Sequence, residues 1–178
     1  MSRVYPDAVA GPYEPPPRSF TDAEGREVTI RRYDGDFESL AEMYDKFDPG
    51  DRAQGIPPSD GEQIRDWLET ITTGEGVNVL AWHGDDVAGH ATLVPEFGDG
   101  GQPVAYELAI FVLHSYQSAG IGSQLIEGLL GAGREDGVER VWLTVERWNN
   151  PAVALYEKVG FEPSDTGSFE LEMAARLQ

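Results

Sequence analysis

The apolar residues of this chain recur with two different periods, and the change from one period to the other marks out its secondary structure. Residues 27–33 alternate between apolar and polar positions, which predicts a first strand. Residues 36–47 and 57–74 place apolar side chains three or four positions apart, which predicts two amphipathic helices. In the second helix, Ser59 and Glu62 stand in the register of a capping box, which favours a helix start at that point.

Both kinds of element continue to the C-terminus. The predicted elements are strands at 77–83, 87–95 and 104–113, a helix at 120–135 with Leu125, Leu129 and Leu130 inward, a strand at 138–146, a short helix at 149–159, and a strand pair within 160–177. This order predicts a mixed α and β domain with one β-turn-α-β unit near its centre. The polar loop 48–58, rich in Gly and Pro, has the length of a functional or mobile segment.

Residues 1–26 differ from the rest of the chain. They carry five prolines and few apolar residues in a regular period, a composition typical of an extended arm. We therefore expect an N-terminal arm over 1–26 and one globular domain over 27–178.

A glycine turn lies between the strand predicted at 104–113 and the helix after it. Glycines such as Gly120 and Gly122 let the backbone approach an anion, and the first amides of a helix are free donors at the positive end of its dipole. A P-loop would need a Gly-Lys pair, which is absent, and a dinucleotide fingerprint would need a third glycine where Leu125 stands. From the turn alone, two interpretations remain: it binds a phosphate, or it is a tight turn that only packs the helix against the strand.

Composition narrows the classes of function. The chain has 32 Asp and Glu against 13 Lys and Arg, a formal net charge of −19, which argues against nucleic-acid binding through a basic face. The dispersed acidity resembles that of proteins from salt-accumulating halophiles, and an acidic groove for a cationic substrate is the competing interpretation. There is no cysteine, and His83, His90 and His114 are not spaced as a metal cluster. With neither a signal peptide nor a membrane span in the pattern, we expect a cytoplasmic protein.

Two motifs resemble those of the GNAT superfamily of N-acetyltransferases. The stretch "SYQSAGIGSQL" is similar to the family's pyrophosphate-binding motif, with Gln117 opening the pattern before Gly120 and Gly122. Further on, "NNPAVALYEKVGF" is similar to a second family signature, from Asn149 to Phe161. Two motifs in the expected order are more specific than either alone. A glycine is frequent in the family where Ser118 stands, and a serine there restricts φ.

The resemblance implies a fold, a reaction and a set of site residues. It implies a mixed, mostly antiparallel sheet with helices on both faces and a splayed central parallel strand pair. It also implies acetyl transfer from acetyl-CoA to an amine by direct attack, without a metal. Tyr156 is implied as the general acid, and Glu107 is our candidate base. The implied acetyl-CoA contacts are Val112, Gln117, Ser118, Ala119, Gly120, Ile121, Gly122, Ser123 and Asn149.

Other readings stay open. Tyr156 could be a core aromatic and Glu107 a solvated strand carboxylate. The whole domain could be a non-catalytic acyl-CoA-binding sensor or interaction module, or have a structural or assembly role with no ligand. The acceptor is expected to be an amine-bearing small molecule or a protein lysine or N-terminus, with no nucleic-acid or membrane partner and a homodimer left open.

Overall fold

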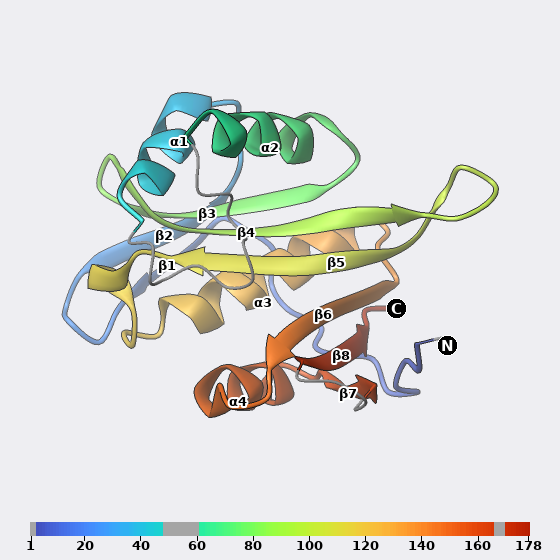
Figure 1. The fold of residues 1–178 in the computed structure, drawn as a ribbon. Helices are drawn as coiled ribbons and strands as arrows, with labels where there is room; N and C mark the ends of the chain where they lie inside the picture. The colour runs from blue at the N-terminus through green and yellow to red at the C-terminus, as the bar shows by residue number, and fades with distance from the viewer. Residues whose placement is uncertain (1–2, 48–60, 166–169) are drawn as a thin grey trace.

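A computed structural model describes residues 3–47, 61–165 and 170–178, and within them the chain forms one eight-stranded sheet with helices on both faces (Figure 1). The elements in chain order are β1 (Arg18–Thr21), β2 (Glu27–Arg32), α1 (Phe37–Asp45), α2 (Gly61–Thr73), β3 (Val77–His83), β4 (Asp86–Phe97), β5 (Pro103–Val112), the 3₁₀ helix η2 (His114–Tyr116), α3 (Ile121–Glu135), β6 (Arg140–Glu146), α4 (Asn150–Lys158), β7 (Glu162–Asp165) and β8 (Glu170–Arg176). The predicted loop 48–58 and Ser59 of the predicted capping box lie outside the described residues.

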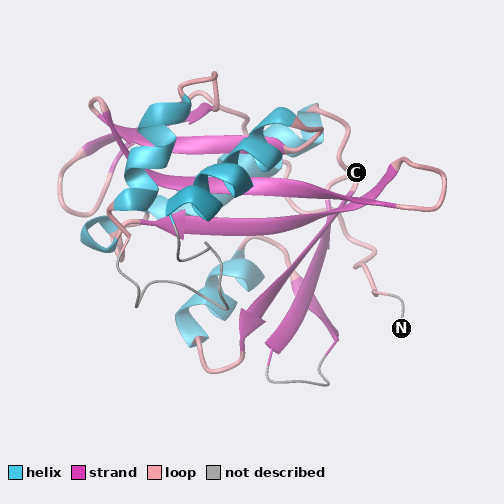
Figure 2. Ribbon diagram, turned by 45° about the horizontal axis from the view of Figure 1, so that its top comes forward, coloured by secondary structure: helices cyan, strands magenta, loops and turns pink. Residues whose placement is uncertain are grey.

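The sheet is antiparallel except at its centre. Its strand order is β1-β2-β3-β4-β5-β6-β8-β7, and only β5 and β6 pair in parallel. That parallel pair has two register partners, Tyr106 with Val141 and Glu107 with Trp142. Beyond them the two strands diverge, as Figure 2 shows. The predicted mixed, mostly antiparallel sheet with a splayed parallel pair is therefore confirmed.

Two hydrophobic cores lie on opposite faces of the sheet. On one face α1 and α2 pack over β3 to β5, and their contacts include the wholly buried Leu40 and Leu68. On the other face α3 packs through Leu125, Leu129 and Leu130, each at most 1% exposed, as their predicted inward orientation requires. The spacing of these leucines places them along one stripe of the helix, and burying that stripe holds α3 against the sheet.

The N-terminal arm is packed against the domain. Its last residues form β1, which pairs with β2, so the sheet begins inside the segment that we assigned to the arm. Upstream, the Ala10 amide donates to the carbonyl of Arg176 on β8 at 2.8 Å. The Tyr13 hydroxyl donates to the Val159 carbonyl at 2.9 Å. Gly131 of α3 leaves room for this crossing, because a Cβ there would lie 2.7 Å from the Tyr13 carbonyl oxygen.

Candidate functional site

The glycine turn joins β5 to α3 through a short irregular segment. Gly120 is the N-cap of α3 and has a φ of 91°, a left-handed conformation that favours glycine. Ser118 also has a positive φ, 60°. The serine therefore adopts a backbone conformation that costs a non-glycine residue of the order of 1 kcal/mol.

The backbone amides of this turn form a row of free donors. In the described part of the chain, none of the amides from Ser118 to Ser123 donates to a backbone carbonyl. They stand at the positive end of the α3 dipole. Such a row can bind an anion through donors that come from the backbone.

Gln117 and Val112 meet beside the turn. The Gln117 side-chain amide donates to the Val112 carbonyl at 3.0 Å. This bond connects the end of β5 to the start of the turn, so Gln117 has a positioning role that the motif alone did not specify.

Arg26 is a contact of the turn that sequence reasoning missed. No Lys or Arg lies near residues 115–124 in the sequence, but the β1–β2 hairpin brings the Arg26 guanidinium within 3.1 Å of the Ser115 carbonyl. The same guanidinium lies 4.3 Å from the centre of the Tyr116 ring and is held at 2.7 Å by Asp22. From the same hairpin, the Ala23 amide donates to the Ala119 carbonyl at 3.0 Å. The fold therefore brings a cation beside the turn, although no Lys or Arg is near it in the sequence.

Because β5 and β6 diverge after Glu107, the later backbone amides and carbonyls of β5 that face β6 form no hydrogen bonds with that strand. The Leu113 amide donates to the Ala88 carbonyl on β4, and Val112 is the register partner of Gly89. Residues of an antiparallel pair alternate between bonding their partner strand and pointing away from it. Ile110 and Val112 therefore direct their amide and carbonyl groups toward the side from which β6 has diverged.

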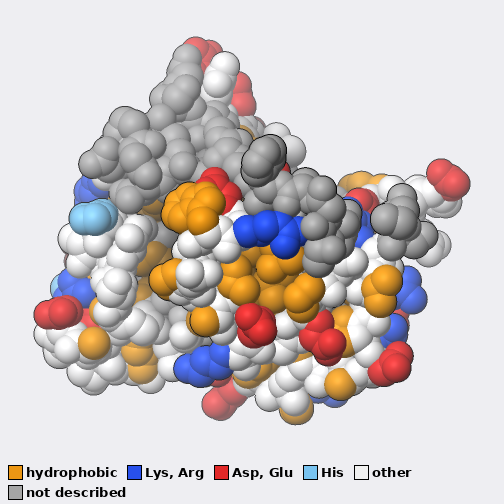
Figure 3. Space-filling view, turned by 60° about the horizontal axis from the view of Figure 1, so that its bottom comes forward, with side chains coloured by type: hydrophobic (Ala, Val, Ile, Leu, Met, Phe, Trp, Pro, Cys, Tyr) orange, Lys and Arg blue, Asp and Glu red, His pale blue; other side chains and the backbone are white. Residues whose placement is uncertain are grey.

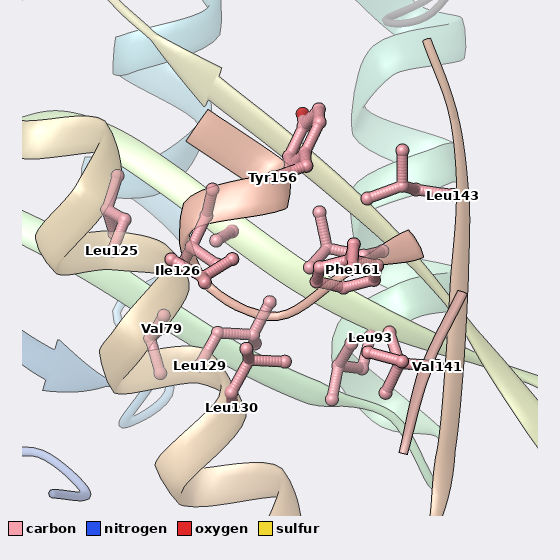
Figure 4. Close-up of a cluster of buried hydrophobic side chains, with 14 of the residues drawn as sticks. Val79, Leu93, Leu125, Ile126, Leu129, Leu130, Val141, Leu143, Tyr156 and Phe161 are labelled. Atoms are coloured by element: carbon pink, nitrogen blue, oxygen red, sulfur yellow. The ribbon is translucent and has the colours of Figure 1, made fainter. Parts of the chain in front are cut away.

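Tyr156 lies on α4, next to the turn. It is 8% exposed and its ring contacts the ring of Phe161, 5.9 Å away between centroids. Figure 4 shows the hydroxyl at the end of the ring that points away from the hydrophobic cluster. Burial raises the pKa of Tyr156 to about 12, so the hydroxyl keeps its proton at neutral pH. The side chain of the preceding residue, Leu155, lies 3.7 Å from the place of a Cβ on Gly122, which sets α4 beside the start of α3.

Asn149 has a structural position. Its side-chain oxygen accepts from the Ala152 amide at 3.3 Å and caps α4, and Pro151 occupies the first turn. The structure thus uses Asn149 to start the helix that carries Tyr156.

Glu107 lies on the opposite face from α3, at the point where β5 and β6 separate. Its neighbours at alternate positions, Ala109 and Phe111, pack with α1 and α2, so the Glu107 side chain shares that face. Burial raises the pKa of Glu107; Arg3 lowers it, and Glu96, Glu170 and Glu172 raise it further. The net rise makes this carboxylate a stronger base than a solvated one.

Two of the three histidines bond tyrosine hydroxyls, and the third, His114, begins η2 just before the turn. His90 is wholly buried, bonded through Nδ1 to the Tyr44 hydroxyl at 2.7 Å and through Nε2 to the Asn78 side-chain oxygen at 2.8 Å. Burial lowers the pKa of His90 to about 3, so the ring is neutral. His83 bonds the Tyr116 hydroxyl at 2.7 Å. Among residues 3–47, 61–165 and 170–178, no three His, Asp or Glu side chains form a metal-binding group.

A parallel strand pair that splays beside a glycine turn at a helix start is the arrangement that the resemblance to the GNAT superfamily implies, and comparison with known proteins agrees. Residues 37–161 match the model of the acetyltransferase (GNAT) family, so the chain belongs to that family. The GNAT domain of a Streptomyces lividans protein named PAT superposes with a TM-score of 0.76 at 18% identity, over 90% of this chain and 96% of that one. A phosphinothricin acetyltransferase from Sinorhizobium meliloti, solved with AcCoA, superposes with a TM-score of 0.68 at 20% identity, over 84% and 88%. At these identities the likeness establishes the fold.

Curated relatives match part of the chain. A mycothiol acetyltransferase from Saccharomonospora viridis is 40% identical over 38% of this chain and 22% of its own length. A [ribosomal protein bS18]-alanine N-acetyltransferase from Haemophilus influenzae is 40% identical over 36% of this chain and 45% of its own length. The chain thus spans less than half of either relative. No helix in the described segments has the length and hydropathy to cross a membrane.

Proposed function

We propose that this protein transfers the acetyl group of acetyl-CoA to a primary amine by direct attack in a ternary complex. The observation that carries this is the row of free amides at the start of α3, placed beside the divergence of β5 from β6. A phosphate-bearing cofactor and a strand-like pantetheine arm would find complementary donors and acceptors in these two places.

The cofactor side uses the backbone. We assign the pyrophosphate to the amides from Ser118 to Ser123, and the pantetheine arm to the outward backbone groups near Val112. Gln117 and Asn149 support this arrangement through their bonds to the end of β5 and the start of α4. Acetyl-CoA supplies the activated thioester.

The acceptor side uses side chains. Glu107 takes a proton from the ammonium form of the acceptor, directly or through a water, because only the free amine attacks a carbonyl carbon. As the new C–N bond forms and the C–S bond breaks, the Tyr156 hydroxyl donates its proton to the departing sulfur. The nitrogen loses its second proton to solvent as it becomes an amide, and Tyr156 regains a proton from solvent. With a pKa of about 12, Tyr156 suits a hydrogen-bond donor whose proton moves only as negative charge grows on the sulfur.

The proposal includes the class of acceptor and the high-salt environment in which the protein works. Two relatives are named for N-acetyl transfer, one to an alanine of ribosomal protein bS18 and one as an N-alpha-acetyltransferase, so we take an amine-bearing small molecule or a protein lysine or N-terminus as the acceptor class. The acidic side chains are dispersed over the face in Figure 3 rather than gathered in one patch, which supports a halophile-type surface in a cytoplasm of high salt.

The test is acetyl transfer from acetyl-CoA to a panel of amines in molar KCl, comparing wild type with Glu107→Gln. We expect turnover in wild type and a loss of about 10² in kcat/KM in the variant, with calorimetric affinity for CoA unchanged. Tight CoA binding without turnover on any amine would support the acyl-CoA sensor instead. An absence of CoA binding would reject both functions.

A further inference from the structure

The N-terminal arm places a cation on the acceptor side of the site. Arg3 Nη1 lies 2.9 Å from Glu96 Oε1, and Arg3 Nε lies 2.7 Å from Glu172 Oε1. The guanidinium carbon is 3.6 Å from the centre of the Trp142 ring. Because Glu96 is on β4 and Glu172 on β8, this one side chain bridges the strands on either side of the β5–β6 junction.

The bridge lies over the residue that we assign as the base. Trp142 is the register partner of Glu107, and its strand neighbours Val141 and Leu143 are buried in the α3 core, so Trp142 shares the face of Glu107. The positive charge of Arg3 also lowers the pKa of the Glu107 carboxyl, whereas Glu96, Glu170 and Glu172 raise it.

Arg3 is bound as an alkylammonium or guanidinium ligand would be. Carboxylates surround the cation and an indole face lies under it, an arrangement that recognises organic cations. An acceptor amine is protonated at neutral pH and must come to Glu107 in that form. It would then meet the same carboxylates and the same ring.

The arm can release Arg3 without leaving the domain. Its strong anchors begin downstream, where Arg176 Nε donates to the Pro6 carbonyl at 3.1 Å and the Ala10 amide bonds β8. Upstream of Pro6, the Val4 side chain is 67% exposed and its amide donates to Ser164 Oγ at 2.8 Å. Partly exposed ion pairs are weak, so residues 3–5 are the part of the arm that is easiest to displace.

We propose that the start of the arm is an intramolecular competitor of the acceptor: the Arg3 guanidinium stands where a cationic amine binds, and residues 3–5 lift to admit it. This rests on the proposed function, since it takes Glu107 as the base. The competition further implies that the acceptor binds as a cation, either as a small organic ammonium ion or as a protonated protein amine.

The test is the affinity of the CoA-loaded protein for putrescine, measured by calorimetry in wild type, Arg3→Gln, Arg3→Lys and Arg18→Gln. Arg18→Gln is the matched control, because it removes the same charge from the same arm at a residue that pairs with Glu127 on α3. If the arm fills the site at least nine-tenths of the time, Arg3→Gln tightens putrescine binding by about tenfold or more. Arg3→Lys keeps a cation and should stay near wild type. Melting curves establish that each variant is folded.

Equal putrescine affinities in wild type and Arg3→Gln would overturn the competition. So would equal changes in Arg3→Gln and Arg18→Gln, because these would report net charge alone, or equal binding of the uncharged butane-1,4-diol. Acetyl transfer, assayed separately, distinguishes the two proposals. Transfer with unchanged putrescine affinity rejects the arm's role and leaves the transferase, whereas tighter binding without any transfer rejects the transferase and leaves the competition.

Discussion

The proposed cofactor side and the proposed acceptor side of the site are built in different ways. On the proposed cofactor side, the consecutive residues from Ser118 to Ser123 offer backbone amides at one helix start. On the acceptor side, single side chains arrive from β4, β5, β6, β8 and the N-terminal arm, and no two of them are adjacent in sequence. A site made of backbone needs a short run of residues with the right conformations, whereas a site made of side chains needs the whole topology.

The first prediction tests whether the cofactor side depends on the backbone. Gly122→Val adds a side chain at the amide row, and a Cβ there meets only the Leu155 side chain at an ordinary 3.7 Å, so the protein should fold. We expect CoA affinity to fall by about a hundredfold or more, since losing two charge-assisted hydrogen bonds costs about 3 kcal/mol or more. Calorimetry measures it, with Gly100→Val in the open β4–β5 loop as the control. An unchanged affinity in folded Gly122→Val would remove the pyrophosphate from this turn.

The second prediction concerns the one side chain that serves chemistry from the cofactor side. Tyr156→Phe deletes a hydroxyl and keeps the ring against Phe161, so packing is retained. We expect kcat to fall by more than about tenfold, with little change in acetyl-CoA affinity, because general acid catalysis is typically worth about 10² to 10⁴. Tyr13→Phe, which deletes a phenol bonded to Val159, should leave kcat near wild type. A chemical step as fast in Tyr156→Phe as in wild type, by single-turnover kinetics, would make Tyr156 a packing residue.

The third prediction asks how far side chains support the backbone site. Arg26→Met keeps an apolar stem near the Tyr116 ring and removes the guanidinium that bonds the Ser115 carbonyl. Losing that bond should weaken CoA binding by about three- to tenfold, in line with 0.5–1.5 kcal/mol per hydrogen bond. Titration against Arg18→Met gives the comparison. Equal affinities in the two variants would show that the turn holds its shape without the hairpin.

The smallest expected effect is shared by both sides. The charge of −19 repels itself and repels a polyanionic cofactor, so the melting temperature should rise by several degrees between low and molar KCl. CoA affinity should rise with it. A flat or falling melting curve would favour the alternative, in which the acidity serves to attract a cationic substrate.

The contrast between the two sides also explains what could be predicted from sequence. The apolar patterns located the strands and helices from Glu27 onward, because the helices bury one side against the sheet and the central strands β3 and β4 are buried along most of their length. The turn at Gly120 was found because its function depends on consecutive residues. The short β1 strand was missed because its four residues, Arg18–Thr21, follow a proline-rich segment and carry one large apolar side chain, Phe20.

The acceptor side could be predicted only in part. Glu107 was selected as a candidate base from its strand position, but nothing local connects it to Arg3, Trp142 or Glu172. These residues meet because β8 returns beside β6 and the arm then runs along β8. Similarly, Arg26 reaches the turn through a hairpin almost ninety residues earlier in the chain. Tertiary proximity of this kind leaves no trace in a single sequence.

The pairing of β5 with β6 through only two register pairs has a consequence for the dynamics of the molecule. A sheet held together at its centre by the partners of Tyr106 and Glu107 can open there more easily than elsewhere, so α4 and the strands from β6 onward would form a separate cooperative unit in amide hydrogen exchange. A ligand bound between the diverging parts of β5 and β6 would supply the backbone hydrogen bonds that the two strands do not make with each other. By mass action it would slow exchange in that unit, by an amount that corresponds to about 2.7 kcal/mol at a hundred times its dissociation constant. The same gap that admits the cofactor is therefore the place where its binding would most stiffen the protein.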